Sequence, residues 1–301
     1  MTAVPRAHSA MASVSSMPSL DGVRLATPED LARIATVAAA GFFHSPTFHY
    51  QRVHYAAYPD DTLLRRHEEC GANLGPQGCS SYWSEYDRAI RDGTSVVLVA
   101  EDTLDETEGN DVYPALRDAT AYTPGASTSG SKLVVGVASV DIKPGSSYIG
   151  MFQPPRSTDQ TDGHDLPANA QRDLCEERVR AYKEATTPAK IRYLQGQMRL
   201  STLAVHPAYW NRGHATRLVG YITRLADLDG VPLGISAVPQ GAIVAARAGF
   251  EERELVRVKQ ACVHKETNVA EVELWVAIRR PSGTPVSGES LGDNAMSPES
   301  Q

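Results

Sequence analysis

Residues 203–217, with the sequence LAVHPAYWNRGHATR, combine the features of a helix start that binds an anion. An apolar run reaches Val205, a short turn follows, and Gly213 opens a segment with helical spacing. The first N–H groups of a helix have no partner inside it and lie at the positive end of its dipole, so they bind phosphate or pyrophosphate. Gly213 lets the backbone approach such an anion closely, and Arg212 and Arg217 can add positive charge at the rim. Taken alone, this spacing also fits an ordinary strand–loop–helix turn.

The segment as a whole resembles motif A of the GNAT superfamily of N-acetyltransferases. That motif is R/Q-x-x-G-x-G/A, placed after a strand that ends in a Leu-Ala-Val-like sequence and a turn that contains proline. Its six positions are occupied here by Trp210, Asn211, Arg212, Gly213, His214 and Ala215. Downstream, residues 248–251 (AGFE) resemble the Gly-Phe that ends the family's next helix. The resemblance covers roughly residues 23–280, and its specific part is residues 198–251. The long loops and the sequence AYWNRGH at residues 208–214 look like those of fungal members.

The resemblance implies an α/β fold with a mixed, mostly antiparallel central sheet flanked by helices. It also implies acetyl-CoA as the co-substrate, without a metal, and an amine as the acceptor in a ternary complex. Carried over by position, the N–H of Leu203 would be the catalytic oxyanion donor to the thioester carbonyl. Ala204 and Val205 would run antiparallel to the pantetheine arm. The pyrophosphate would be wrapped by Asn211, Arg212, Gly213, His214, Ala215 and Thr216.

Two positions of this chain depart from the family pattern, one in motif A and one where a general base is expected. Trp210 stands where the family usually has Arg or Gln, which removes one side-chain amide or charge. Arg199 stands where histone-type members have a glutamate base, four residues before Leu203. The base is therefore unassigned. Asp141 is a candidate, although an acid at a strand end is more often simply solvated.

A third departure concerns the departing thiolate. Many members have a tyrosine four residues before the glycine of Gly-Phe, and this chain has Ala245 there. A free thiol has a pKa of about 8.5, so the thiolate leaves near neutral pH without much help. Tyr209 or Tyr221 is an alternative proton donor that the sequence leaves open.

The reading that fits these residues best is an N-acetyltransferase that acts on the amine of a small molecule. A protein lysine or N-terminal acetyltransferase is one alternative, and a non-catalytic acyl-CoA-binding protein is another. No nucleophile elbow is present, which disfavours a hydrolase. His44, His49 and His54 recur every five residues and would scatter around a helix, so we expect no metal site. Aromatic residues at 42–58 are expected in the core, with part of them bordering the acceptor.

A sheet and helices must position this segment. Apolar runs and alternation predict strands at residues 23–25, 96–100, 133–140, 198–205, 233–238, 255–262 and 272–278. Helical spacing and caps predict a helix beginning at residues 27–30 and further helices at 60–70, 80–92, 172–185, 213–229 and 242–248. Pro188 is expected to close the helix at 172–185. The order of these elements predicts one mixed α/β sheet.

Composition excludes some classes of protein and delimits the folded domain. The 301 residues carry a formal charge of −7, so nothing suggests the basic surface that nucleic-acid binding needs. No stretch approaches the roughly 20 apolar residues of a membrane span. The four cysteines form no CxxC pair, which fits reduced thiols in a cytoplasmic protein. We expect disordered tails at residues 1–22 and 281–301, with a mitochondrial presequence as the alternative for the first. One domain at 23–280 would carry long loops at 101–131 and 143–170, the first of them solvated.

Overall fold

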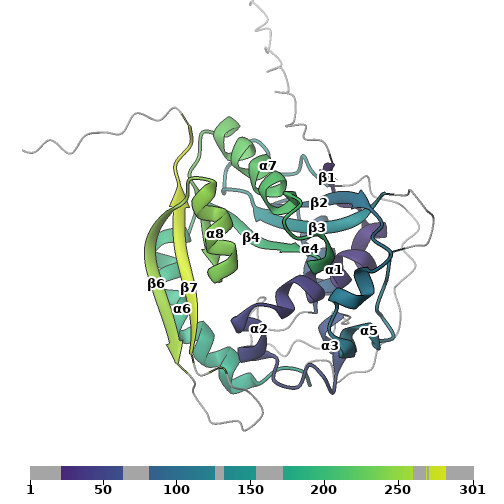
Figure 1. Cartoon of the computed structure of the whole chain (residues 1–301). Helices are drawn as coiled ribbons and strands as arrows, with labels where there is room; N and C mark the ends of the chain where they lie inside the picture. Colours follow the sequence, from purple (N-terminus) through teal and green to yellow (C-terminus); the bar gives the residue numbers. More distant parts are fainter. Residues whose placement is uncertain are drawn as a thin grey trace, which may run out of the picture.

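A seven-stranded sheet forms the centre of the molecule, with the strand order β1-β2-β3-β4-β5-β7-β6 (Figure 1). The computed structural model describes residues 22–63, 81–125, 132–153, 172–259, 269 and 271–282. Neighbouring strands are antiparallel, except for β4 and β5, which run parallel. This arrangement confirms the predicted mixed, mostly antiparallel sheet flanked by helices.

The elements follow the apolar runs and capping signals of the sequence. The strands are β1 Val23–Leu25, β2 Ser95–Thr103, β3 Lys132–Asp141, β4 Met198–Val205, β5 Leu233–Ala237, β6 Glu251–Lys259 and β7 Glu271–Arg279. The α-helices are α1 Leu31–Phe43, α2 Pro46–Gln51, α3 Pro59–Leu63, α4 Tyr82–Arg91, α5 Pro114–Arg117, α6 Glu176–Leu194, α7 His214–Leu228 and α8 Pro239–Arg247. Short 3₁₀ turns are η1 Pro28–Asp30, η3 Glu108–Asp111 and η4 Pro207–Tyr209. None of the helices in the described residues is both long and apolar enough to cross a membrane.

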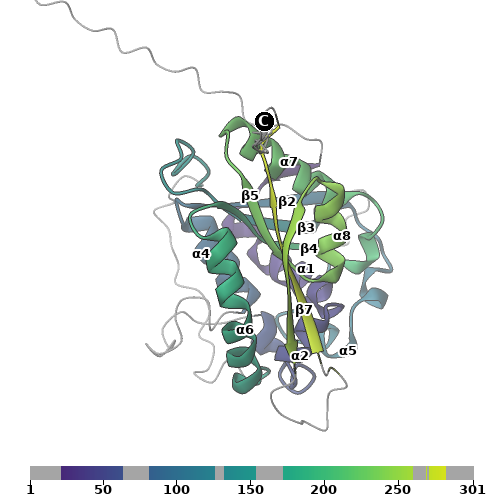
Figure 2. The same ribbon diagram turned by 90° about the vertical axis from the view of Figure 1, so that its left-hand side faces the viewer.

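Helices cover both faces of the sheet. Helices α1 and α4 pack on one face over β2, β3 and β4, with Ile34, Val37, Tyr86 and Val137 in the shared cluster. Helices α7 and α8 pack on the other face, with Leu200, Leu218, Ile222 and Leu233 between them and the strands. Helix α6 covers β6 and β7, and Figure 2 shows it on the same side of the molecule as α4, with α8 on the other side.

Helix α6 differs from its prediction. It begins at Glu176 and continues to Leu194, with Pro188 inside it and not at its end. A proline removes one N–H of the helical ladder and crowds the carbonyl one turn before it. Beyond the proline, however, Ala189 and Leu194 are buried against β6 and β7. This packing outweighs the local cost, so tertiary contacts decide where the helix ends.

The predicted solvated loop at residues 101–131 is also partly wrong. Strand β2 continues to Thr103, and η3 and α5 follow it, while residues 126–131 lie outside the described part. Glu108 of η3 is only 4% exposed. Its carboxylate accepts two hydrogen bonds from Arg33 of α1, each 2.8 Å long, and one from the N–H of Gly125. A charge is buried here because a guanidinium on another element pairs with it.

Other predictions fall partly outside the described residues. Of the helix expected at residues 60–70, the structure describes α3 as far as Leu63. Of the loop expected at 143–170, it describes residues 143–153. The two expected tails lie outside the described residues, except for residues 22, 281 and 282.

Candidate functional site

The two parallel strands at the centre of the sheet separate after a short stretch of pairing. Strand β4 pairs with β5 at three positions only: Met198 with Leu233, Arg199 with Gly234, and Leu200 with Ile235. Beyond Leu200, β4 stays paired with β3 as far as Val205. The edge of β4 that faces β5 is therefore open over residues 201–205. A pocket of about 450 Å³ lies at this opening.

The backbone of β4 directs alternate residues toward this pocket. The N–H of His206 donates to the carbonyl oxygen of Val135 on β3, at 2.9 Å. In an antiparallel ladder, successive residues direct their backbone groups to opposite sides. Ala204 therefore also faces β3, whereas Leu203 and Val205 face the opening. The N–H of Leu203 is thus directed into the pocket, as an oxyanion donor must be.

The start of α7 forms the second side of the pocket. Asn211 has φ 62° and Gly213 has φ 84°, so two left-handed residues turn the chain from η4 into the helix. Gly213 is the N-cap of α7. A Cβ atom at Gly213 would meet no atom within 4 Å, so the space before the helix start is open. The free N–H groups of the first turn face that space and suit an anionic group.

The structure brings together all but one of the predicted cofactor residues. The pocket is lined by Leu203, Ala204, Val205, Asn211, Gly213, His214, Ala215 and Thr216. Arg212 is the exception, because its guanidinium bonds to Asp105 at 2.7 Å and to the carbonyl oxygen of Ala208 at 3.0 Å. Arg217 is also engaged within the protein, since it lies 2.8 Å from Nδ1 of His214. Both arginines hold the loop in place and do not stand free at the rim.

His214 has a role that the motif does not indicate. Its side chain is completely buried, and Nε2 lies 2.9 Å from a carboxylate oxygen of Asp102 at the end of β2. Burial lowers the pKa of this imidazole, and the hydrogen bond to Asp102 opposes the shift. The ring therefore fastens the first turn of α7 to β2.

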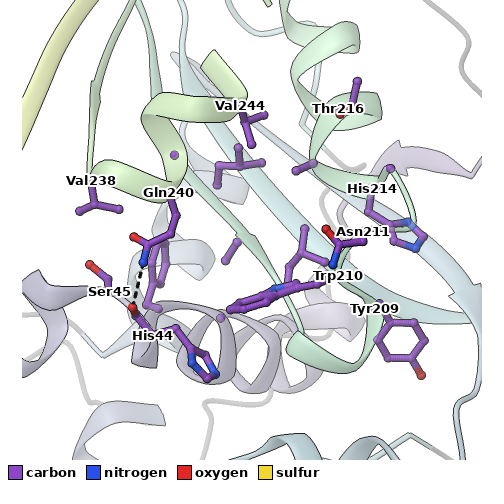
Figure 3. Close-up of a pocket in the computed structure, with 18 of the residues that line it drawn as sticks. His44, Ser45, Tyr209, Trp210, Asn211, His214, Thr216, Val238, Gln240 and Val244 are labelled. Atoms are coloured by element: carbon purple, nitrogen blue, oxygen red, sulfur yellow. Dashed lines mark hydrogen bonds between the residues drawn. The ribbon is translucent and has the colours of Figure 1, made fainter. Parts of the chain in front are cut away.

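The remaining wall comes from the end of α1 and from α8. It consists of Gly41, Phe42, His44, Ser45, Val238, Gln240, Gly241, Val244 and Arg247. Figure 3 shows the amide of Gln240 reaching across to the carbonyl oxygen of His44, at 3.3 Å. The ring of His44 lies 4.8 Å from that of Trp210. The sequence placed part of the 42–58 region near the acceptor and predicted a helix at 242–248. It did not identify the pocket residues of α8, because this segment carries no motif beyond the final Gly-Phe.

The two tyrosines considered as proton donors do not present their hydroxyls to the pocket. Tyr209 is 0% exposed, and its hydroxyl donates to Glu108 at 3.0 Å and accepts from the N–H of Asp105 at 2.9 Å. Figure 3 shows this hydroxyl turned away from Trp210. Tyr221 is 4% exposed and packs in the cluster beneath α7.

Two further candidates lie away from the pocket lining. Ala245 is 1% exposed and packs in the same cluster as Tyr221, while Val244 beside it lines the pocket. Asp141 at the end of β3 accepts hydrogen bonds from Arg199 at 2.5 Å and from Ser201 at 2.8 Å. Asp141 therefore has partners that hold it beside the paired half of β4. In the described part of the chain, no group of three or more His, Cys, Asp and Glu side chains is arranged to hold a metal ion.

Comparison with known proteins agrees with this geometry. No family model matches the sequence. The chain is 29% identical over 234 residues to a protein of Stachybotrys chartarum named acetyltransferase, covering 78% of this chain and 82% of that protein. The predicted resemblance to acetyltransferases is confirmed. With it the predicted class of enzyme, an acetyltransferase, is confirmed as well.

Two solved structures of N-acetyltransferases are also similar. One is a GCN5-related N-acetyltransferase from Rhodopseudomonas palustris, at 16% identity and a TM-score of 0.36, covering 88% of this chain and 96% of that one. The other is the PaiA N-acetyltransferase of Thermoplasma acidophilum in complex with coenzyme A. It is 9% identical with a TM-score of 0.39, covering 86% of this chain and 97% of that one.

Proposed function

We propose that the protein transfers the acetyl group of acetyl-CoA directly to the amine of a small molecule, within a ternary complex. One observation carries this proposal: a single pocket joins the open edge of β4 to the free N–H groups at the start of α7. A thioester on a long, pyrophosphate-bearing arm needs both features, one at each end. The open space before Gly213 is where a pyrophosphate would fit.

The chemistry assigned to the chain is mainly electrostatic. When bound, acetyl-CoA supplies the activated acetyl group. The N–H of Leu203 would stabilise negative charge on the carbonyl oxygen during attack, an effect worth about 3 kcal/mol for comparable donors. The amine nitrogen forms a bond to the carbonyl carbon, and the bond from that carbon to sulfur breaks. Because neither Tyr209 nor Tyr221 offers its hydroxyl to the pocket, the thiolate would take its proton from the amine or from solvent.

The nature of the acceptor rests on two observations. Arg199 replaces the glutamate of histone-type members, and Asp141 engages it, so this position offers no free carboxylate for a lysine tail. A protein acceptor is therefore the weaker alternative. A non-catalytic acyl-CoA-binding protein is the second candidate, favoured because none of the described residues that line the pocket is an acid or offers a tyrosine hydroxyl.

An acceptor screen separates these functions. Purified protein is mixed with acetyl-CoA and a panel that contains an alkylamine, an arylalkylamine, a polyamine, an amino sugar and a lysine peptide, and a thiol reagent measures the CoA released. We expect turnover of a small amine. We also expect CoA to raise the melting temperature, because a ligand at 100 times its Kd adds about 2.7 kcal/mol to the free energy of unfolding. Turnover of the peptide alone would make the protein a protein acetyltransferase. Stabilisation without any turnover would favour the acyl-CoA-binding function, and no stabilisation by millimolar CoA would refute the proposal.

A further inference from the structure

Helix α8 lines the pocket along its whole length. Its residues Gln240, Val244 and Arg247 all belong to the pocket lining. They are four and then three positions apart, so they lie on one face of the helix. Figure 3 shows Gln240 beside His44 and Val244 farther along α8, on the side toward α7. Seven residues of an α-helix span about 10 Å, so the pocket extends about that far from Gln240 to the last residue of α8.

Arg247 brings a positive charge to this end of the pocket. Its side chain is exposed, and no hydrogen bond or ion pair within the described residues engages its guanidinium. The two arginines near the start of α7 differ in this respect, since Arg212 bonds to Asp105 and Arg217 lies against His214. Among the lining residues that the structure describes, Arg247 is therefore the guanidinium whose donors remain available to a ligand.

A structural role accounts for the charge of Arg247 but not for its place in the lining. It stands in the last turn of α8, where a cation interacts favourably with the negative end of the helix dipole. That interaction needs a positive charge near the helix end and does not require the residue to face a cavity. The position of Arg247 on the same face as Val244 and Gln240 is the observation that indicates a ligand.

Coenzyme A carries one phosphate more than the start of α7 accounts for. Two of its phosphates form the pyrophosphate, and the third is a monoester on the 3′ oxygen of the ribose. The free N–H groups after Gly213 suit the pyrophosphate, so the third phosphate needs donors of its own. The planar fork of a guanidinium matches the geometry of a phosphate. Because the chain has a formal charge of −7, a local positive charge also offsets its repulsion of a polyanion.

We propose that Arg247 binds the 3′-phosphate of coenzyme A and thereby makes the protein prefer coenzyme A to its 3′-dephospho form. This inference rests on the proposed function. The pocket then serves the cofactor in three places. They are the open edge of β4 for the thioester arm, the start of α7 for the pyrophosphate, and Arg247 for the third phosphate.

Calorimetric titration of the full chain with CoA and with 3′-dephospho-CoA tests this assignment. We expect the wild type to bind CoA about five- to tenfold more tightly than dephospho-CoA. Arg247→Gln should raise the Kd for CoA by that factor and leave the Kd for dephospho-CoA unchanged. Arg247→Lys should recover part of the preference, and added salt should reduce it.

Arg224→Gln is the matched control. Arg224 is an exposed arginine of α7 that does not line the pocket, so this variant loses the same charge from the neighbouring helix. It should keep the wild-type ratio of the two Kd values. An equal loss of the ratio in Arg224→Gln would mean that overall charge, and not a contact with Arg247, sets the preference.

The other outcomes separate this inference from the proposed function. A wild type that binds both ligands equally, or an Arg247→Gln variant that keeps the preference, would remove Arg247 from the 3′-phosphate. Equal weakening of both ligands by Arg247→Gln would assign it to another part of the cofactor or to the fold. Should Arg247→Gln fail to fold, the ratio in Arg247→Lys decides, because an unchanged ratio and an unchanged salt dependence would refute the contact. If the wild type binds neither ligand, the proposed function itself is wrong.

Discussion

The indole Nε1 of Trp210 donates a hydrogen bond of 2.7 Å to the carbonyl oxygen of Val205, the last residue of β4. The same indole packs edge-on against the ring of His44 at the end of α1. One side chain thus fastens the loop before α7 to both other walls of the pocket. This hydrogen bond occupies the carbonyl oxygen of Val205. The backbone groups of Leu203 remain the open part of the strand edge.

Removal of this bond should loosen the loop and leave the fold intact. Trp210→Phe keeps a ring near His44 but has no N–H, and a neutral hydrogen bond contributes about 1 kcal/mol net. We expect the Kd for acetyl-CoA, measured by calorimetry, to rise about fivefold, because the N–H groups at the start of α7 lose their fixed orientation. An unchanged Kd would mean that the bond does not order the binding loop.

Gly213 tests the position of the pyrophosphate. Gly213→Glu places a negative charge at an open helix start, so we expect loss of acetyl-CoA binding with a folded protein. Gly230, at the other end of α7, also has a left-handed φ, of 63°, and equally open surroundings. Gly230→Glu therefore carries the same backbone strain and should keep its affinity. Equal losses in the two variants would place the phosphates elsewhere.

Gly41 tests the close approach of α1 to the strand edge. Inside a helix, Gly→Ala normally stabilises by about 0.5–1 kcal/mol. A Cβ at Gly41 would instead lie 2.8 Å from the carbonyl oxygen of Val205. We expect Gly41→Ala to destabilise the protein by about 1–3 kcal/mol and to weaken acetyl-CoA binding. Gly93→Ala, whose Cβ would make an ordinary contact at 3.8 Å, is the control in urea unfolding. A Gly41→Ala variant that is more stable than wild type would show that α1 can move away from Val205 at little cost.

Tyr209→Phe separates a structural hydroxyl from a catalytic one. The hydroxyl bridges Glu108 and the N–H of Asp105 inside the protein. Its removal leaves a buried carboxylate oxygen with one partner fewer, so we expect a loss of about 1–3 kcal/mol of stability. Single-turnover rates of the folded variant should stay within about threefold of wild type. A hundredfold loss of rate with full acetyl-CoA affinity would make Tyr209 the proton donor after all.

The sequence predicted the strand–loop–helix unit at 198–229 well because its signals are local. An apolar run, a turn proline and a glycine before an amphipathic stretch each act within a few residues. Helix α2 was not predicted, although Ser45 caps it through the N–H of Thr47 and Pro46 stands at its first position. Its six residues are too few for a helical period to show.

The rest of the site depends on contacts between distant parts of the chain. Gly41 approaches Val205 only because α1 crosses the end of β4, and no spacing in the sequence records that crossing. Likewise Glu108 lies in an acidic, polar stretch that resembles a solvated loop, and Arg33 determines its burial. The ion pair of Arg212 with Asp105 could not be predicted for the same reason, since Asp105 belongs to another segment of the chain.

His206 should make the stability of the protein depend on pH. It is 0% exposed, its Nδ1 accepts from the N–H of Ala208, and Nε2 has no hydrogen-bond partner among the described residues. Burial, aided by the charge of Arg33, lowers the pKa of His206 from 6.5 to about 4, against the opposing effect of Glu108. Between these two values the unfolded chain binds a proton that the folded protein does not.

Folding stability contributed by His206 is therefore lost as the pH falls from 6.5 toward 4, by at most about 3 kcal/mol. His206→Asn keeps a side-chain acceptor for the N–H of Ala208 but has no group that titrates in this range. The lowered pKa of Glu108 acts in the same direction; its main downward causes, the hydrogen bond and charge of Arg33, are present in both proteins, and only the smaller contribution of His206 differs between them. Urea unfolding at pH 7, 5.5 and 4.5 should show the wild type losing stability more steeply than the variant. Parallel curves would mean that His206 becomes protonated within the folded protein at little cost.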